Sequence, residues 1–317
     1  MSASQLKSSV AYDVIGDIHG QAEKLFALLR QMGYTQRASG WVPPQGRQAV
    51  FVGDLIDRGP KQLDVLETVR GLIDNGYGHA VMGNHEFNAI GYVTPSRSAP
   101  SQFLRKHKKS SEAQHAAFLA QVGKGSAKHR EWVQWFRTLR PTLDLGGIRV
   151  VHAWWHDAHA DLIDRLWPQG RPMSDEFLHA AYDDTRPEWA AMEGLTKGLE
   201  VKLPDGHSFF DHAGVERHEV RTRWWLAQPS SLREVAIVDA NQATRVPEAP
   251  LPANYPASPV AGSPVFIGHY WLTGAPSLQT SKLACLDYSA AHHGPLVAYR
   301  WNGETDLYPA ALVACSH

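Results

Sequence analysis

The sequence predicts an α/β fold in which parallel strands alternate with helices. The first third of the chain alternates short apolar runs with stretches of helical periodicity, and each apolar run ends in a glycine followed by polar residues. Of the 317 residues, 43% are hydrophobic, as in ordinary globular proteins. Strands and helices that alternate at this spacing favour parallel strands joined by crossover helices. We expect one domain over residues 8–317.

The early elements follow one another with few interruptions. Apolar runs predict strands at residues 11–16, 48–53 and 79–83, and apolar side chains at helical spacing predict helices at residues 21–33 and 61–76. This order predicts a parallel sheet whose strand ends meet at one edge.

The rest of the chain is less regular. Residues 102–139 predict a helix with an apolar stripe, and LDLGGIRVVHA (143–153) predicts a β-hairpin. The rhythm is lost over residues 158–262, an insertion of helical and loop character that includes a proline-rich stretch and could form a lid or cap. PVFIGHYW (264–271) restarts a buried strand, and SKLACLDYS and GPLVAYRWNG predict a closing pair of strands.

Composition excludes several classes of protein. The formal net charge of −1 gives no global field that would draw the chain to nucleic acid or to an anionic membrane. The only dense basic run is LRKHKK (104–109), and such runs are usually solvated helix faces, so no stable nucleic-acid binding is expected. No apolar run approaches the ~20 residues that cross a bilayer, and the two cysteines are too few for a disulfide framework. We expect a cytoplasmic protein without a membrane partner.

Acidic, amide and imidazole side chains follow five of the predicted strands. They are Asp17 and His19 in GDIHG, Asp54, Asp57 and Arg58 in GDLIDRGP, Asn84 and His85 in GNHE, His152 in VVHA and His269 in FIGH. Alone, each motif has an ordinary explanation, such as a helix cap for Asn84 or a core position for His152. Ligands of open α/β sheets bind beyond the carboxyl ends of the strands, so the joint occurrence of these motifs predicts one site.

The donor types indicate metal chemistry. Carboxylate, amide oxygen and neutral imidazole suit Mn, Fe or Zn, and thiolate is missing from the motifs. Asp17 and His19 can offer two ligands from one turn, and a carboxylate such as Asp54 can bridge two ions. Two neighbouring metal ions can hold a hydroxide and clamp the attacking and leaving oxygens of a phosphate ester. The pattern therefore predicts a phosphoesterase.

These motifs together resemble the calcineurin-like metallophosphoesterase superfamily, and within it the phosphoprotein phosphatases and the bacterial symmetrical diadenosine tetraphosphate hydrolases. They span Gly16 to His269, most of the chain. The resemblance implies an α/β fold of αββα type, a sandwich of two mixed β-sheets flanked by helices. It also implies two divalent metal ions, with manganese expected and iron, zinc, nickel or cobalt as alternatives.

The resemblance also implies a role for each motif residue. Asp17, His19 and Asp54 would hold the first metal, and Asp54 would also bridge to the second, whose site Asn84, His152 and His269 would complete. His85 would protonate the leaving oxygen and Asp57 would orient His85. Arg58 would bind the phosphate. Glu86 is expected only as an acidic residue near the positive end of a helix.

The chain departs from the superfamily pattern near the last motif. Many members have GHxH, where this chain has GHYW, so Tyr270 and Trp271 are candidate substrate contacts. A second phosphate-binding arginine is usual in the phosphatases, and Arg221 and Arg223 are the candidates for it.

A dinucleoside polyphosphate hydrolase, acting on a diadenosine tetraphosphate-like substrate, is the first functional hypothesis. Nucleobases stack on aromatic rings, and tryptophans occur near the motif ends at positions 154, 155, 224, 225 and 271, although core packing is their commoner role. A bacterial Ser/Thr or Tyr phosphoprotein phosphatase could use the same site. A non-catalytic binding scaffold is disfavoured because every expected ligand is present, and a nuclease is disfavoured by the net charge.

Overall fold

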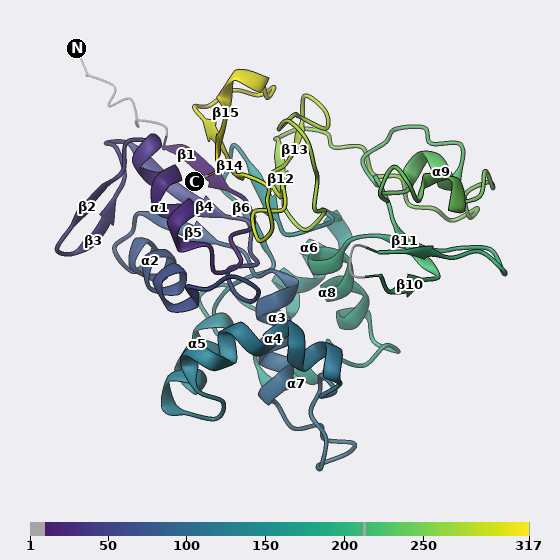
Figure 1. Cartoon of the computed structure of the whole chain (residues 1–317), viewed down its shortest axis with the longest axis horizontal. Coiled ribbons are helices and arrows are strands. Elements are labelled where there is room, and N and C mark those ends of the chain that lie inside the picture. The colour runs from purple at the N-terminus through teal and green to yellow at the C-terminus, as the bar shows by residue number, and fades with distance from the viewer. Residues whose placement is uncertain (1–9, 212–213, 317) are drawn as a thin grey trace.

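Two β-sheets packed face to face form the centre of the structure, which a computed structural model describes over residues 10–211 and 214–316 (Figure 1). The five-stranded sheet has the order β15 (Leu312–Cys315), β14 (Leu296–Trp301), β1 (Ala11–Ile15), β4 (Arg47–Phe51), β5 (Gly78–Ala80). The four-stranded sheet has the order β13 (Leu283–Cys285), β12 (Val265–Ile267), β7 (Arg149–Val151), β6 (Thr142–Asp144). Both sheets mix parallel and antiparallel pairs, which confirms the expected sandwich.

Side-chain alternation along the strands builds two apolar layers. In β12, Phe266 faces the core between the sheets, while Val265 and Ile267 face the outer, helix-covered core. In β4, Val50 likewise faces the inner core and Phe51 the outer one. Because both faces of each sheet are covered, most strand residues at the centres of the sheets are apolar and buried.

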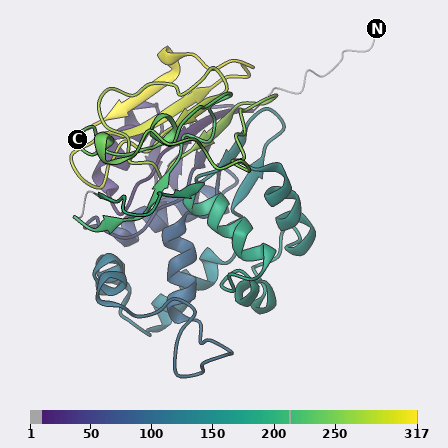
Figure 2. The ribbon, with the colours of Figure 1, turned by 90° about the vertical axis from the view of Figure 1, so that its right-hand side faces the viewer.

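Helices cover the outer faces of the sandwich. They are α1 (Ala22–Gln31), α2 (Gln62–Asp74), α3 (Asn84–Val93), α4 (Lys109–Val122), α5 (Ala127–Phe136), α6 (Asp157–Leu166), α7 (Asp175–Ala180) and α8 (Pro187–Lys197), whereas the short α9 (Leu232–Val235) lies apart from the sheets. Helices α1 and α2 contact the five-stranded sheet, while the helices of residues 84–197 gather on one side of the sheets (Figure 2). None of the helices in the described ranges is long and apolar enough to cross a membrane.

Two expectations for secondary structure need correction. The helix predicted over residues 102–139 is two helices, α4 and α5, because Gly123 and Gly125 adopt left-handed backbone angles (φ 77° and 74°) and Ser126 caps α5 through a bond from His129 N–H. The predicted closing pair is wrong as a pair: β13 lies parallel to β12 in one sheet, and β14 lies between β1 and β15 in the other. The hairpin at 143–153 is confirmed as β6 and β7.

The insertion at 158–262 consists of two parts. Its first part is the helices α6 to α8, whose buried side chains join the main core. Its second part has a small apolar cluster of its own, lies at the right-hand edge of Figure 1, and includes β8 (Glu200–Lys202), β9 (Phe209–Phe210), β10 (Glu216–Arg217), β11 (Glu219–Arg221) and α9. This second part also places Trp224 and Trp225 in the main core, and its role as a lid or cap stays a prediction.

Candidate active site

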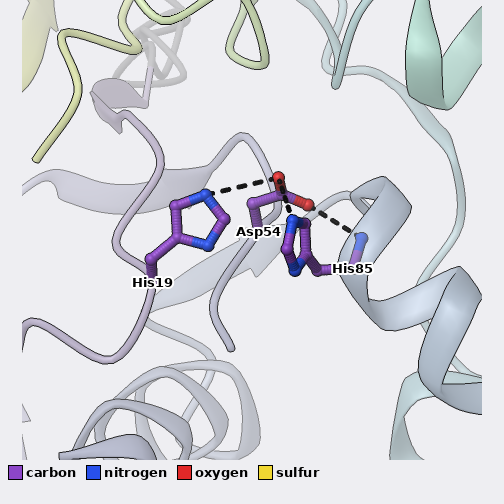
Figure 3. A group of neighbouring side chains, drawn as sticks. All are labelled: His19, Asp54 and His85. Carbon is purple, nitrogen blue, oxygen red and sulfur yellow. Dashed lines mark hydrogen bonds and ion pairs between the residues drawn. The ribbon is translucent and has the colours of Figure 1, made fainter. Parts of the chain in front are cut away.

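The carboxylate of Asp54, in the loop after β4, lies at the centre of the predicted constellation. Three imidazole nitrogens surround its Oδ2 atom: Nε2 of His19 at 3.5 Å, of His152 at 3.3 Å and of His85 at 3.8 Å. Figure 3 shows how the imidazoles of His19 and His85 converge on this carboxylate from separate elements. The loops after parallel strands therefore meet as the sequence predicted.

Backbone carbonyls orient two of these imidazoles. His19 Nδ1 bonds to the carbonyl oxygen of Ile56 at 2.8 Å, and His152 Nδ1 bonds to that of Val52 at 2.7 Å. In both residues the Nδ1 atom acts as the donor, which directs Nε2 at the site. This orientation is the one that a metal-binding histidine requires. Burial alone would lower the pKa of His152, but the charges of Asp54 and Asp17 outweigh it and raise the pKa to about 10, so this ring must lose a proton to bind a metal.

The remaining predicted ligands lie beside Asp54. Asn84 Oδ1 is 3.2 Å from His152 Nε2 and 3.0 Å from His269 Nδ1. The backbone N–H of His269 donates to Asp17 Oδ2 at 3.0 Å, which ties the loop after β12 to the loop after β1. All six predicted metal ligands are thus brought together.

The donors fit two divalent cations. Two groups of buried ligand atoms share Asp54, one with His19 and His85 and the other with His152 and His269. Asp17 Oδ1, His19 Nε2 and His269 Nε2 are buried and have no hydrogen-bond partner among the residues that the structure describes. Buried polar atoms without partners are costly, and oxygen and imidazole donors aimed at a common centre are suited to metal ions. The first of these groups contains His85, where the resemblance implied Asp17 as the third ligand. The Nδ1 atom of His85 is already bonded to Asp57.

Strained backbone angles accompany the site. His19, Asp54, Asp57, Arg58 and His269 have φ values of 48°, 50°, 72°, 68° and 72°. Such angles are uncommon for residues other than glycine and persist only where the surroundings enforce them. Six of the seven described non-glycine residues with positive φ are predicted site residues, Trp271 being the sixth.

Glu86 provides much of that enforcement. Its carboxylate accepts backbone hydrogen bonds from Asp54, Leu55, Ile56 and Gly83, at 2.9 to 3.3 Å. Gly83 is required here, because a Cβ atom on it would lie 2.2 Å from Asp54 Oδ1. Glu86 is therefore more than the helix-start residue that was expected, since it holds the loop that carries Asp54.

Burial and close charges shift the pKa values of the site residues. Burial and neighbouring His85 lower the pKa of His19 to about 3, so its imidazole is neutral and able to bind a metal at ordinary pH. Burial and the charge of Asp287 raise the pKa of Asp17. Burial alone would also raise the pKa of Asp54, but His152 and His85 hold it well below its usual value. Several acids thus share one buried space, a situation that cations relieve.

His85 is held by a second carboxylate. Its Nδ1 bonds to Asp57 Oδ2 at 2.6 Å, as the resemblance implied, and His115 Nδ1 bonds to Asp57 Oδ1 at 2.8 Å. Gln114, which precedes His115 on α4, places its Nε2 atom 3.2 Å from His85 Nε2. Sequence reasoning missed both α4 residues, although His115 shares the buried face of α4 with Phe118 and Val122 at helical spacing.

Asp287 is a further site residue that sequence reasoning missed. Its buried carboxylate accepts N–H groups of Trp271 at 2.8 Å and Ser289 at 3.0 Å, and its charge acts on Asp17. Asp287 follows β13 just as the predicted ligands follow their strands. The rule that located the other residues would therefore have found it.

The candidate substrate contacts divide into two groups. Arg58 stacks on Trp271, with its guanidinium carbon 3.6 Å from the ring centroid. Arg221 is half-buried and lies close to His269. Burial is the main cause that lowers the pKa of His269, and the positive charge of Arg221 adds to it. By contrast, Arg223 is exposed and Tyr270 is buried, with its hydroxyl accepting from Trp224 Nε1 at 3.0 Å. Tyr270 as a substrate contact is therefore corrected: it is a packing residue.

Most of the tryptophans near the motifs are core residues. Trp154, Trp224 and Trp225 are buried, whereas Trp155 and Trp271 are partly exposed. The basic run 104–109 is also not a helix face: it is an irregular segment that ends where α4 begins.

Known proteins support the family indicated by the motifs. The family model for calcineurin-like phosphoesterases matches residues 12–221. The chain is similar to the asymmetrical bis(5'-nucleosyl)-tetraphosphatases PrpE of Bacillus subtilis (strain 168), with 45% identity over 76 residues, and of Anoxybacillus flavithermus, with 43% over 74 residues. These matches cover 24% and 23% of this chain, and the chain spans only 31% and 30% of those relatives.

A solved structure of a cold-active protein-tyrosine phosphatase from a psychrophilic Shewanella has a TM-score of 0.43 and 15% identity, over 96% of this chain and 80% of that one. The tetraphosphatases bear the word asymmetrical in their names, whereas the motifs had indicated the symmetrical branch. The superfamily itself is as expected, and the chain belongs to the calcineurin-like phosphoesterase family.

Proposed function

We propose that the chain hydrolyses a phosphate ester or phosphoanhydride with the help of two divalent metal ions, and that its substrate is a dinucleoside polyphosphate. The observation that carries the proposal is the convergence of buried histidines on Asp54 with His85, held by Asp57, beside them. A metal centre next to an oriented imidazole is the combination that phosphoryl transfer to water requires.

The metal ligands follow from the donor set. Asp17, His19 and Asp54 would hold one ion, and Asp54, Asn84, His152 and His269 would hold the other. When bound, such ions supply a nucleophile at neutral pH and neutralise charge on the phosphoryl group. We propose manganese as the metal, because oxygen and imidazole donors without thiolate suit it. The cytoplasmic location stays a prediction.

The side chains of the chain then have separate tasks. His85 gives the proton on Nε2 to the leaving oxygen, and Asp57 fixes the ring through Nδ1. Arg58 binds phosphate oxygens from a guanidinium that Trp271 holds in place by stacking. Arg221, the half-buried member of the arginine pair, is the second phosphate contact.

The substrate class is supported by the names of the relatives and by the surroundings of the site. The relatives are named as tetraphosphatases of bis-nucleosyl compounds. Trp155 and Trp271, the partly exposed tryptophans of the predicted set, could stack on nucleobases. A phosphoprotein phosphatase would use the same metal ligands, so the substrate panel decides between the two.

The test is a panel of diadenosine tetraphosphate, phosphopeptides and cyclic nucleotides with the full chain and Mn²⁺. We expect cleavage of the tetraphosphate, loss of it with a chelator, and a fall in kcat of roughly 10²–10⁴-fold in His85→Asn. The matched control is His207→Asn, which alters an exposed histidine and should leave the rate unchanged. If only the phosphopeptides are cleaved, the substrate is a phosphoprotein and not a dinucleoside polyphosphate. An unchanged rate in His85→Asn would refute the catalytic role of His85.

A further inference from the structure

The basic segment at residues 104–109 is fixed against α3, the helix whose first residues include His85. The N–H of Leu104 bonds to Thr94 O at 2.9 Å, and the N–H of Arg105 bonds to Gly91 O at 3.0 Å. The segment therefore has a defined position beside the active site even though it lacks regular secondary structure.

Aromatic stacking strengthens this attachment. The ring of His107 lies between Tyr92, with a centroid distance of 3.9 Å, and Phe103, with a centroid distance of 4.4 Å. His107 Nε2 also bonds to Tyr92 O at 2.8 Å. Stacked pairs and a backbone contact on one side chain make a rigid anchor, which holds neighbouring Arg105 in place.

Arg105 is connected to the proton donor through one side chain. Its guanidinium donates to Gln114 Oε1 at 2.6 Å, which fixes the orientation of that amide. The amide N–H of Gln114 then faces His85 Nε2 at 3.2 Å, so Nε2 accepts from Gln114 in this structure, and the amide must turn toward the leaving oxygen when His85 is protonated. Arg105, Gln114 and His85 thus form a row of contacts that ends at the proton donor.

The charge of Arg105 is not matched by a carboxylate in contact with it. Across residues 10–211 and 214–316, no ion pair of Arg105 with an acidic side chain is found. The side chain is half-buried, and this burial lowers its pKa. A partly desolvated guanidinium with donors to spare is well suited to an anionic ligand.

The position of the row determines which part of a substrate it meets. The leaving oxygen must lie within hydrogen-bond reach of His85 Nε2, and hence next to Gln114. A protein phosphoester or an aryl phosphate has an alcohol or phenol at this place, whereas a phosphoanhydride has a charged phosphate group. The positive charge of Arg105, next to Gln114, therefore favours a phosphoanhydride as the substrate.

We propose that Arg105 and Gln114 form a leaving-group subsite that binds the departing phosphate of a phosphoanhydride. The inference rests on the proposed function and names the part of that site which selects anhydrides over monoesters. A water oxygen bonds to phosphorus and gives up a proton to solvent, the P–O bond to the departing phosphate breaks with its electron pair on the departing oxygen, and His85 Nε2 supplies a proton to that oxygen and is reprotonated from solvent. Arg105 and Gln114 contact the departing phosphate as its charge grows.

The decisive variant is Arg105→Gln, assayed as full chain with Mn²⁺ on diadenosine tetraphosphate and on p-nitrophenyl phosphate. We expect kcat/KM for the tetraphosphate to fall about 10- to 100-fold, because a hydrogen bond from a charged group is lost. This fall should be at least about tenfold larger than the fall in kcat/KM for the aryl phosphate. Arg105→Lys keeps the charge and should recover part of the difference. Lys106→Gln removes the same charge from an exposed position of the same segment and should alter neither rate.

Each other outcome has a defined meaning. Equal losses on both substrates would show that Arg105 only supports His85, which overturns the subsite while the proposed function stands. If the wild type cleaves aryl phosphate but not the tetraphosphate, the proposed substrate fails, and inhibition of aryl phosphate hydrolysis by ADP then decides on the subsite. A weaker inhibition constant for ADP in Arg105→Gln would support an anion subsite, and an unchanged one would overturn it.

Discussion

Asp54 and Asp57 lie three residues apart in one loop, are both buried, and both have left-handed backbone angles, yet their surroundings differ. Asp57 accepts a hydrogen bond on each carboxylate oxygen, at 2.6 Å and 2.8 Å from two histidine Nδ1 atoms. Asp54 faces three histidine Nε2 atoms at 3.3 to 3.8 Å, longer than good hydrogen bonds to a charged group.

The difference shows how one loop can supply two kinds of carboxylate. Donors around a metal ion with bonds of about 2.0–2.2 Å stand roughly 3–3.5 Å apart, which is near the spacing around Asp54. At Asp57 the imidazoles are already in direct contact and leave no room for a cation. We therefore regard Asp54 as a metal ligand and Asp57 as the residue that orients His85.

The largest effect is expected at Asp54. Asp54→Asn removes the carboxylate shared by both ligand groups, so we expect Mn²⁺ binding to be lost and kcat to fall by about 10³-fold or more. Calorimetric titration with Mn²⁺ and the phosphatase assay measure the two quantities. Undiminished Mn²⁺ affinity in this variant would contradict the assignment.

A smaller effect, different in kind, is expected at Asp57. Asp57→Asn cannot accept from both histidines with equal strength, so His85 loses its fixed orientation and kcat should fall by about 10²-fold. Because Asp57 is not a ligand, Mn²⁺ affinity should stay near the wild-type value in the same titration. If Asp57→Asn loses the metal as Asp54→Asn does, the two carboxylates are not distinct.

The smallest effect concerns stability at acid pH. Burial raises the pKa of Asp57, but hydrogen bonds from His115 and His85 outweigh it and lower the pKa to about 2. Because this folded-state pKa lies below the ordinary value, the stabilisation is complete above about pH 4 and is lost as the pH falls toward 2. Between pH 5 and pH 3 the free energy of unfolding should lose about 1 kcal/mol from this group.

Urea unfolding of the wild type and Asp57→Asn at these two pH values measures that loss. The stability difference between the two proteins should shrink at the lower pH. A difference that stays constant would mean that the pKa of Asp57 is not depressed by its histidines.

How far the sequence predicted the site depended on the kind of residue. Asp17, Asn84 and His269 were found because each directly follows a strand, and the ends of parallel strands are brought together by the topology itself. His115 and Gln114 were missed because they lie in the middle of α4, where helical spacing indicates the buried face but not the neighbour it meets. The sequence offered no reason to choose between Arg221 and Arg223 as the second phosphate contact. In the structure Arg221 is the last residue of β11, and Arg223 lies beyond the strand.

By itself, the sequence determined the alternation of strands and helices in the first third of the chain, the polar residues that follow the strands and hence the donor set for two cations, because these depend on local patterns of residues. Only the tertiary structure decided that Asp57 holds His115 as well as His85, that Glu86 holds the Asp54 loop, and that Arg105 contacts Gln114 beside the proton donor. Those contacts join residues 9 to 58 positions apart, and their partners are set by the packing of helices on sheets, which no local pattern encodes.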